Sequence, residues 1–279
     1  MSPRVILITG TSSGVGRSLV EAALARGEIV VATLRKPEAL DDLKSKYGSE
    51  QLLVLPFDIT KSDQIQDVFD KAVAAFGKID IVVNNAGVTL IGEVETSTAE
   101  QARALFDTNF FAPLEIAKFA VGFFRKQGGG ILLQNTSSSA TNAVAGLGIY
   151  SASKAALEWA SDALRDELDP AWGIKVINLQ IGGTKTNLGM NGTFIAKDPL
   201  YSNPSLPQNQ MMAAFSSGSM PMADADKVAQ AVLKTLALPA DELPKRLILG
   251  ADAVAAVQAK AAELAALAEH DKELAVSVM

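Results

Sequence analysis

The sequence predicts an α/β fold in which about seven parallel strands form one doubly wound sheet with helices on both faces. Short, continuous apolar runs recur along the chain, such as residues 4–8 and 29–33, and such runs are typical of strands buried on both faces. Longer segments with apolar residues at helical spacing separate these runs. Because crossovers between parallel strands are right-handed, this alternation favours a single sheet, and we expect residues 1–279 to form one domain.

The composition excludes several classes of protein. The net charge is −6 and there is no basic block, so nucleic acid is not an expected partner. The chain has no Cys, which excludes disulfides and thiolate metal sites, and its single His, His270, lies in a polar stretch that we expect at the surface. The first strand begins by Arg4, and no apolar run approaches the ~20 residues of a membrane span. We therefore expect a cytoplasmic protein without a metal, a signal peptide or a membrane span.

A glycine-rich turn follows the first strand at Thr9–Gly16 and leads into a helix over residues 17–26. Strand, glycine turn and helix are the context of a dinucleotide site: Gly10 permits the tight turn, Gly14 the approach of a pyrophosphate, and Gly16 close helix packing. The N-terminus of the helix offers N–H groups and a positive dipole end to phosphates. A plain turn between strand and helix is the alternative. The residues that we expect at the cofactor here are Gly10, Ser12, Ser13, Gly14, Val15 and Gly16.

The end of the second strand, residues 29–33, bears on the choice of cofactor. A site that prefers NAD usually ends this strand with an acid that bonds the ribose 2′-hydroxyl, whereas this chain continues with Leu34, Arg35 and Lys36. Cations suit a 2′-phosphate, and Arg can bind it with two hydrogen bonds. We therefore predict NADP(H) rather than NAD(H), with surface charges at a strand end as the alternative. A polar helix is expected next, over residues 38–47.

The third strand, residues 52–56, delivers Asp58 and Ile59 to the carboxyl end of the sheet, where ligands of such folds bind. Asp58 can accept a hydrogen bond from an adenine amino group. Asp58 or Thr60 can equally cap the helix that is expected over residues 62–76. The sequence leaves these two interpretations equal.

Small and amide residues follow the fourth strand, residues 79–83. Asn85, Ala86 and Gly87 at the end of a central strand would let a cofactor lie against the backbone, although a structural turn is the alternative. A helix is expected next over residues 99–126, with Thr98 as its cap.

Asn109 lies inside this predicted helix between apolar residues, where its propensity is poor. A buried amide needs hydrogen-bond partners, so Asn109 is either a structural hydrogen-bonder or a residue of a functional site.

The next strand, residues 131–134, leads into a serine run that contains Ser137, thirteen residues before Tyr150. Tyr150 and Lys154 begin a helix that is expected to run to about residue 168. Residues four apart lie on one face of a helix, and a nearby cation favours the phenolate form of Tyr. The alternatives are an ordinary loop for the serines and an ordinary amphipathic helix for Tyr150 and Lys154.

The last strands and helices are less informative. A strand over residues 175–180 ends in Gly182–Thr186. The segment 187–222 is rich in Met and Pro, and we predict a substrate-binding lid with one or two short helices, because long structureless loops are uncommon unless functional and Met adapts to apolar ligands. A mobile insertion is the alternative.

A helix from Asp224 to about Leu238 and a strand over residues 246–249 complete the predicted sheet. The Ala, Leu and Val residues of a terminal helix, residues 252–275, are expected to pack on the main domain or on another subunit.

Taken together, these motifs resemble the short-chain dehydrogenase/reductase family. Thr9–Gly16 matches its Thr-Gly-x-x-x-Gly-x-Gly motif, and residues 84–87 match its Asn-Asn-Ala-Gly. Its catalytic set matches Asn109, Ser137, Tyr150 and Lys154. Ile181 stands where the family often has Pro, and Gln134 replaces a common Asn. The resemblance implies a Rossmann-type fold and an NADP(H)-dependent oxidoreductase of the carbonyl reductase type, acting on a ketone or aldehyde, or on the corresponding alcohol, of a partly apolar small molecule.

The resemblance also implies roles for single residues. Tyr150 would be the general acid/base, Ser137 would hold the substrate oxygen, and Asn109 would hold a water molecule that links Lys154 to solvent. Lys154 would lower the pKa of Tyr150 and hold the nicotinamide ribose, to which Tyr150 also lies close. The last strand end would contact the nicotinamide through Gly182, Thr184 and Thr186.

Two rival functions are weighed against this one. A catalytically silent nucleotide-sensing protein on the same fold has no need of the four catalytic residues together. A sugar-nucleotide epimerase or dehydratase resembles a longer chain with Gly-x-x-Gly-x-x-Gly, which this sequence does not follow. A homodimer or homotetramer is compatible with the sequence.

Overall fold

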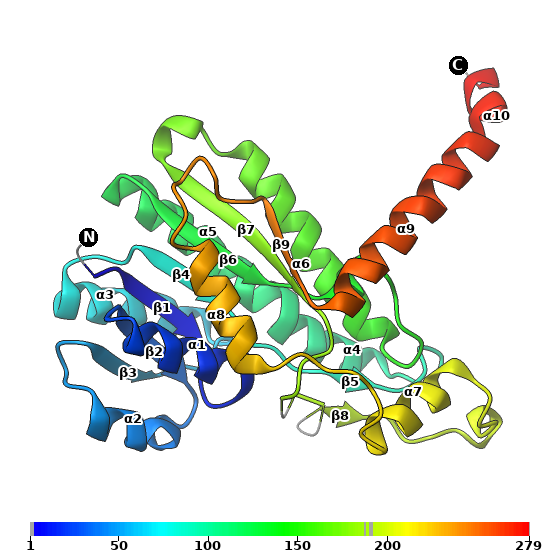
Figure 1. The fold of residues 1–279 in the computed structure, drawn as a ribbon, viewed down its shortest axis with the longest axis horizontal. Coiled ribbons are helices and arrows are strands. Elements are labelled where there is room, and N and C mark those ends of the chain that lie inside the picture. Colours follow the sequence, from blue (N-terminus) through cyan, green and yellow to red (C-terminus); the bar gives the residue numbers. More distant parts are fainter. Residues whose placement is uncertain (1–2, 187, 190–191, 279) are drawn as a thin grey trace.

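One seven-stranded parallel sheet forms the centre of the molecule (Figure 1). The computed structural model describes residues 3–186, 188–189 and 192–278. The strand order is β3-β2-β1-β4-β6-β7-β9, which confirms the predicted doubly wound α/β sheet. The strands are β1 Val5–Thr9, β2 Ile29–Leu34, β3 Leu52–Pro56, β4 Ile81–Asn84, β6 Gly130–Asn135, β7 Ile174–Ile181 and β9 Arg246–Leu249.

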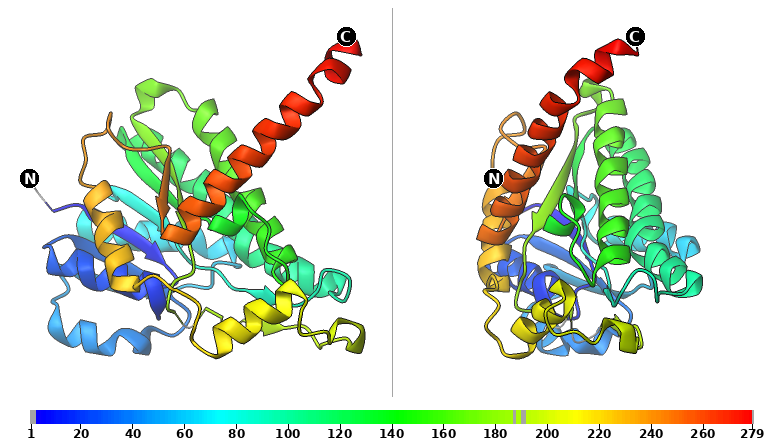
Figure 2. Two further views of the ribbon diagram at one scale, coloured as in Figure 1. Left: turned by 45° about the vertical axis from the view of Figure 1, so that its right-hand side comes forward. Right: turned by 90° about the vertical axis from the view of Figure 1, so that its right-hand side faces the viewer.

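Helices cover both faces of this sheet, and the two layers are seen edge-on in Figure 2. The helices are α1 Gly14–Ala25, α2 Asp41–Lys46, α3 Ile65–Phe76, α4 Ala99–Phe106, α5 Ala112–Gln127, α6 Gly148–Glu167, α7 Pro207–Ser216, α8 Ala225–Thr235, α9 Ala251–His270 and α10 Lys272–Ser277. Helices α1 and α8 pack on one face, and α3 and α5 pack on the other. Each layer buries the side chains that alternate strand residues direct toward it.

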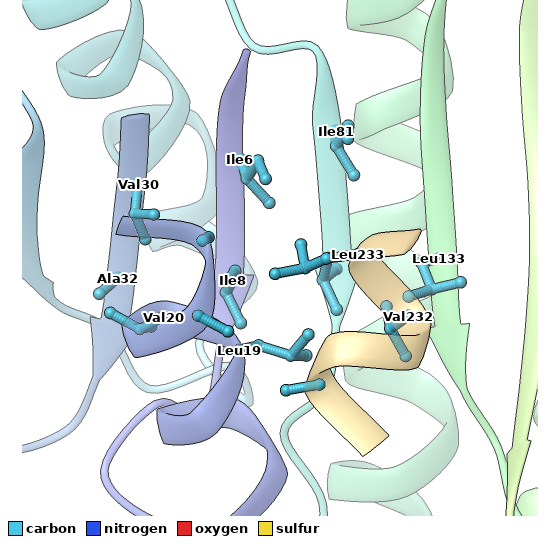
Figure 3. Close-up of a cluster of buried hydrophobic side chains, with 14 of the residues drawn as sticks. Ile6, Ile8, Leu19, Val20, Val30, Ala32, Ile81, Leu133, Val232 and Leu233 are labelled. Carbon is cyan, nitrogen blue, oxygen red and sulfur yellow. The ribbon is translucent and has the colours of Figure 1, made fainter. Parts of the chain in front are cut away.

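The central strands show why their sequences are continuously apolar. Ile6 and Ile8 of β1 face Leu19 of α1 and Val232 of α8 (Figure 3), while the intervening Leu7 packs in the cluster on the other face. A strand covered on both sides needs apolar residues at every position, so its sequence has no alternation. Strand β1 ends at Thr9, so Gly10 begins the turn at the carboxyl edge of the sheet.

The helix expected over residues 99–126 differs from the prediction. Thr98 does cap its start, with a reciprocal hydrogen bond to Gln101. The α-helical pattern is interrupted by a π-helical turn over Asp107–Phe111, so that α4 and α5 are separate elements. Asn109, in the middle of this turn, forms two hydrogen bonds with the backbone of Val88.

The segment after β7 contains a strand that the sequence analysis did not predict. Strand β8 (Thr193–Phe194) pairs in parallel with β5 (Leu90–Ile91) in a small second sheet. Helix α7 and a 3₁₀ turn at Pro199–Tyr201 agree with the one or two short helices predicted there. Residues 187, 190 and 191 of the predicted lid lie outside the described residues.

Within the described part of the chain, none of the helices has the length and apolar character that a membrane crossing requires. The same residues hold no cluster of three or more His, Cys, Asp or Glu side chains suited to a metal ion.

Candidate active site

The glycine turn between β1 and α1 packs tightly against the end of β4. Gly10 has φ +70° and Gly14 has φ +57°, a backbone region that glycine adopts without strain. A Cβ on Gly10 would lie 2.7 Å from the Cα of Ala86. A Cβ on Gly16 would lie 2.4 Å from Nδ2 of Asn85, so the close packing expected of Gly16 is present. Only glycine fits at these two contacts.

Asn85 holds three strand ends together. Its Nδ2 donates to the carbonyls of Thr9, at 2.9 Å, and Gly10, at 3.2 Å. Its Oδ1 accepts a hydrogen bond of 2.9 Å from Nδ2 of Asn135, at the end of β6. The side chain of Asn85 is thus engaged in positioning the sheet edge.

The start of α1 presents backbone N–H groups beside this turn. Its N-cap, Ser13, is extended and makes no side-chain hydrogen bond to the helix. The first N–H groups of a helix have no partner within the helix, so this end of α1 suits an anionic group such as a pyrophosphate. Thr186 closes the turn from the other side, because a Cβ on Gly14 would lie 3.0 Å from its Cγ2.

Two cations and Asp58 lie further along the same edge, at the ends of β2 and β3. Arg35 and Lys36 are both exposed. A surface hollow of about 480 Å³ is lined by Arg35, Pro56, Phe57, Asp58, Gln64, Asp67 and Lys71. An exposed guanidinium at the mouth of such a hollow can bind a phosphate without a large desolvation cost.

Asp58 does not cap the following helix, and neither does Thr60. The carboxylate of Asp58 accepts hydrogen bonds from the N–H of Thr60, at 3.1 Å, and from its hydroxyl, at 2.8 Å. The next turn begins at Lys61 without a side-chain cap. The bonds from Thr60, more than the nearby charges of Lys61 and Arg35, lower the pKa of Asp58. Of the two interpretations, the capping one is therefore wrong, and Asp58 is held ionised beside the hollow.

Tyr150 lies in the first turn of α6, next to the segment that follows β6. Its side chain is 7% exposed and packs with Leu90 and Leu105. The neighbouring hydroxyl of Ser137 favours the phenolate and acts to lower the pKa of Tyr150. Burial is the larger influence, however, and raises the pKa of Tyr150. Lys154 is expected to lower this pKa, but the pKa of Tyr150 is raised.

Lys154 is one helical turn from Tyr150 and is almost completely buried. Its Nζ donates a hydrogen bond of 2.8 Å to the backbone carbonyl of Asn135. Burial disfavours the ammonium and lowers the pKa of Lys154 to about 8. A lysine with this pKa titrates within the range in which enzymes are assayed.

Asn109 faces the same spot from the π-helical turn. Its Oδ1 accepts from the N–H of Val88 at 3.0 Å, and its Nδ2 donates to the Val88 carbonyl at 2.9 Å and to Oγ of Ser153 at 3.2 Å. Ser153 in turn donates to the carbonyl of Tyr150 at 2.7 Å. A Cβ on Gly87 would lie 3.3 Å from Oδ1 of Asn109 and 3.4 Å from Nζ of Lys154. Asn109 is thus a structural hydrogen-bonder that also borders the candidate site.

The loop after β7 is tied to the start of α9. Gly183 donates its N–H to Oδ2 of Asp252 at 2.7 Å. Gly183 and Lys185 also pair with the backbone of Ala223, and Thr184 bonds back to the carbonyl of Gly182. Thr186 of this loop lies against the glycine turn.

Comparison with known proteins identifies the family. A family model described as short chain dehydrogenase matches residues 4–193. The chain belongs to the short-chain dehydrogenase family.

Several similar proteins align with nearly the full length of this chain. An uncharacterised oxidoreductase of Schizosaccharomyces pombe is 32% identical over 275 residues, which cover 98% of this chain and 91% of the relative. A solved short-chain dehydrogenase from Streptomyces avermitilis is 33% identical with a TM-score of 0.88, over 100% of this chain and 99% of that one. Another, from Burkholderia cenocepacia in complex with NADP, is 26% identical with a TM-score of 0.73, over 96% and 97% of the two chains.

The protein is therefore an oxidoreductase of the short-chain dehydrogenase family. Solved structures with this fold contain NADP in some cases and NAD in others. The residues of this dehydrogenase fit such a dinucleotide, because the start of α1 has no side-chain cap and follows a tightly packed glycine turn, which leaves its first N–H groups for a pyrophosphate.

The structure brings most of the predicted site residues of the dehydrogenase together at one sheet edge, around the glycine turn and Lys154, while Arg35, Lys36, Asp58 and Ile59 lie at the neighbouring strand ends. Sequence reasoning missed Asn135, Ser153 and Asp252. Asn135 holds Lys154 through its backbone carbonyl, which no side-chain pattern reveals. Asp252 stands two residues after Gly250, near the start of a helix, and that spacing is its signal in the sequence.

Proposed function

We propose that this short-chain dehydrogenase uses NADP(H) to interconvert a ketone or aldehyde and an alcohol, with Tyr150 as general acid and base. The observation that carries the proposal is the buried hydroxyl pair of Tyr150 and Ser137 next to Lys154, at the edge that also holds the glycine turn. A proton donor, a hydrogen-bonding hydroxyl and a nucleotide cradle are what a carbonyl reduction needs in one place.

Each residue has a task in the reducing direction. The bound nicotinamide cofactor supplies the hydride that reaches the carbonyl carbon. Tyr150 donates its phenolic proton to the carbonyl oxygen as negative charge develops there. Because burial raises its pKa, Tyr150 is fully protonated at neutral pH and ready to act as an acid. Ser137 donates a hydrogen bond to the same oxygen and orients the substrate.

Lys154 would hold the nicotinamide ribose and place a positive charge near the phenol. Its ammonium is anchored by the Asn135 carbonyl, which leaves two of its N–H groups for other acceptors. Asn109 would hold a water molecule at the Gly87 backbone, between Lys154 and solvent. Both residues border Gly87, which supports this arrangement.

Arg35 and Lys36 support the preference for NADP(H). Both cations are exposed at the end of β2, and Leu34 occupies the position where an acid would bind the ribose hydroxyl of NAD. The relative from Burkholderia cenocepacia binds NADP. Asp58 or the neighbouring Ile59 would contact the adenine in the hollow.

The substrate would be partly apolar. Tyr150 belongs to an apolar cluster against which Ile195 packs, and Ile195 follows β8 in the segment that we propose as a lid over the site. In the same segment, Phe194 exposes about half of its side chain to solvent, at 51%. An apolar substrate would cover such side chains. A cytoplasmic location stays a prediction from the sequence.

A panel of ketones and aldehydes, assayed with NADPH and with NADH, tests the proposal. We expect turnover of at least one carbonyl compound, with a higher kcat/KM for NADPH than for NADH. Tight nucleotide binding without turnover over a wide panel would instead support a nucleotide-sensing protein. A better kcat/KM with NADH would overturn the assignment of Arg35.

A further inference from the structure

The end of the chain leaves the body of the molecule as a long helical arm (Figure 2). Helix α9 contacts β9 and a short turn at Ser138–Ala140 through its first part, and every described residue from 261 onward is exposed. Hydrogen bonds continue from α9 into α10, since Asp271 donates to the carbonyl of Leu267 at 3.0 Å and Ala275 donates to that of Asp271 at 2.8 Å. The arm is therefore nearly continuous.

One stripe of this arm has the spacing of a helix–helix seam. Val257, Leu264, Leu267 and Leu274 recur at intervals of seven, three and seven residues, and Lys260 and Asp271 occupy the remaining two positions of the same heptad pattern. Leu264 is 56% exposed, Leu267 50% and Leu274 70%. Three large apolar side chains in one row on a solvated helix indicate a surface that is buried against something else.

We propose that this seam binds the same seam of a second copy of the chain, with the two arms antiparallel about a two-fold axis. The two charged positions select this arrangement. When Leu264 faces the partner's Leu267, Lys260 necessarily faces the partner's Asp271, and Val257 faces the partner's Leu274. The interface then contains two opposite-charge pairs related by symmetry.

The other registers are electrostatically worse. A parallel pairing sets each Lys260 against its own copy and each Asp271 against its own copy, which is repulsive. Sliding the antiparallel pair by one heptad places Lys260 against Leu264, or Asp271 against Leu267, and buries a charge against an apolar side chain. In the single chain, Lys260 contacts Glu263 at 2.9 Å and Asp271 contacts His270 at 2.8 Å, and both of these neighbours flank the seam.

The surface area of the chain is large enough for such an interface. Its accessible surface is 14254 Å², whereas a folded monomer of this mass is expected to expose about 11,500 Å². The difference exceeds the roughly 800 Å² that each partner contributes to a stable interface. The pairing ends at Val257, because Ala253 is already buried against its own chain.

Charge exchange in the full-length protein tests the proposal, with the assembly mass measured by sedimentation velocity. Lys260→Glu alone and Asp271→Lys alone should each halve the mass of the assembly at a concentration where the wild type is associated. The double variant should restore it, and so should an equimolar mixture of the two single variants. The control Ala262→Glu lies on the opposite face of the arm and should leave the mass unchanged.

Disulfide crosslinking tests the register of the two arms. The chain contains no Cys, so any disulfide must join the introduced cysteines. A mixture of Leu264→Cys and Leu267→Cys chains should form a disulfide-linked dimer on oxidation, whereas Ala262→Cys chains should not. Unchanged mass in both single charge variants would overturn the proposal. Dissociation of the single variants without reassociation of the double variant would also overturn it, because the seam would then not pair with an antiparallel copy.

Discussion

Burial acts in opposite directions on the two titrating side chains of the site. It raises the pKa of Tyr150, because the phenolate is poorly solvated, and it lowers the pKa of Lys154 to about 8, because the ammonium is poorly solvated. Tyr150 therefore holds its proton at neutral pH, while Lys154 is close to losing its own. Desolvation therefore decides the pKa of both groups, and it outweighs the lowering of the Tyr150 pKa that is expected from the charge of Lys154.

The pKa of Lys154 predicts how stability depends on pH. The folded-state pKa lies below the ordinary value of 10.5, so the unfolded chain binds more protons between pH 8 and 10.5 and the free energy of unfolding rises with pH there. Between pH 7 and 9.5 we expect a gain on the order of 2 kcal/mol that is absent from Lys154→Met. Urea unfolding of both proteins across this range measures it. An equal pH dependence in the two proteins would contradict the assignment.

Arg35 is predicted to select the cofactor. Arg35→Ala removes a guanidinium that can form two charge-assisted hydrogen bonds to a 2′-phosphate, so the KM for NADPH should rise about 10- to 100-fold while that for NADH changes little. Lys44→Ala, which removes an exposed cation of α2, is the matched control. Equal changes for both cofactors would show that Arg35 does not recognise the 2′-phosphate.

At the scale of elements, the π-helical turn is what brings Asn109 to the site. The turn shifts the side chain toward Val88, with which it makes two backbone hydrogen bonds, and toward Ser153 of α6. Three elements are thereby joined at Gly87 and Lys154: the end of β4, the turn between α4 and α5, and the first turns of α6.

Asn109→Leu should both destabilise the protein and reduce turnover. It leaves the partly buried N–H and C=O of Val88 without their partner and removes the hydrogen bond to Ser153, which should lower the free energy of unfolding by about 1–3 kcal/mol. Thermal unfolding and kcat are the measurements, and Asp107→Ala, an exposed neighbour in the same turn, serves as the control. A stable and fully active Asn109→Leu variant would refute both the structural and the catalytic role.

The same elements show what the sequence can predict and what it cannot. Strands such as β1 and β2 are predictable because burial on both faces requires continuous apolar runs, and the glycine turn is predictable because two of its positions exclude a Cβ. Strands β5 and β8 are too short to show any periodicity. The π-helical turn depends on a hydrogen bond across 21 residues, and the acceptor of Lys154 is a backbone atom. Such contacts leave no local pattern.

At the scale of the whole molecule, a buried polar network joins the catalytic helix to the sheet. Glu158, two turns after Tyr150 on α6, accepts hydrogen bonds from Thr136 at 3.0 Å and from Gln180 at 2.8 Å. It also forms an ion pair of 2.9 Å with Arg246 of β9. Because Thr136 lies next to Ser137 in the chain, this network fixes the distance between Ser137 and Tyr150.

Glu158→Leu should therefore be strongly destabilising. It removes one acceptor each from Thr136 and Gln180 and one of the two carboxylate partners of Arg246. We therefore expect a loss of about 2–3 kcal/mol in the free energy of unfolding, the usual worth of buried hydrogen bonds to a charged group. Glu167→Leu, at an exposed position of the same helix, should change it by less than about 1 kcal/mol. Chemical denaturation measures both. A loss at Glu158 no larger than that at Glu167 would show that the network does not hold α6 on the sheet.

The most direct test of the central claim is the turnover of Tyr150→Phe with an accepted carbonyl substrate, measured beside its affinity for the cofactor. Removing the proton donor should reduce kcat by about 10²- to 10⁴-fold, while the dissociation constant of the cofactor changes little. Tyr47→Phe, far from the site on the chain segment after α2, should behave as the wild type. A Tyr150→Phe enzyme that reduces the substrate at the wild-type rate would contradict the assignment of Tyr150 as the general acid.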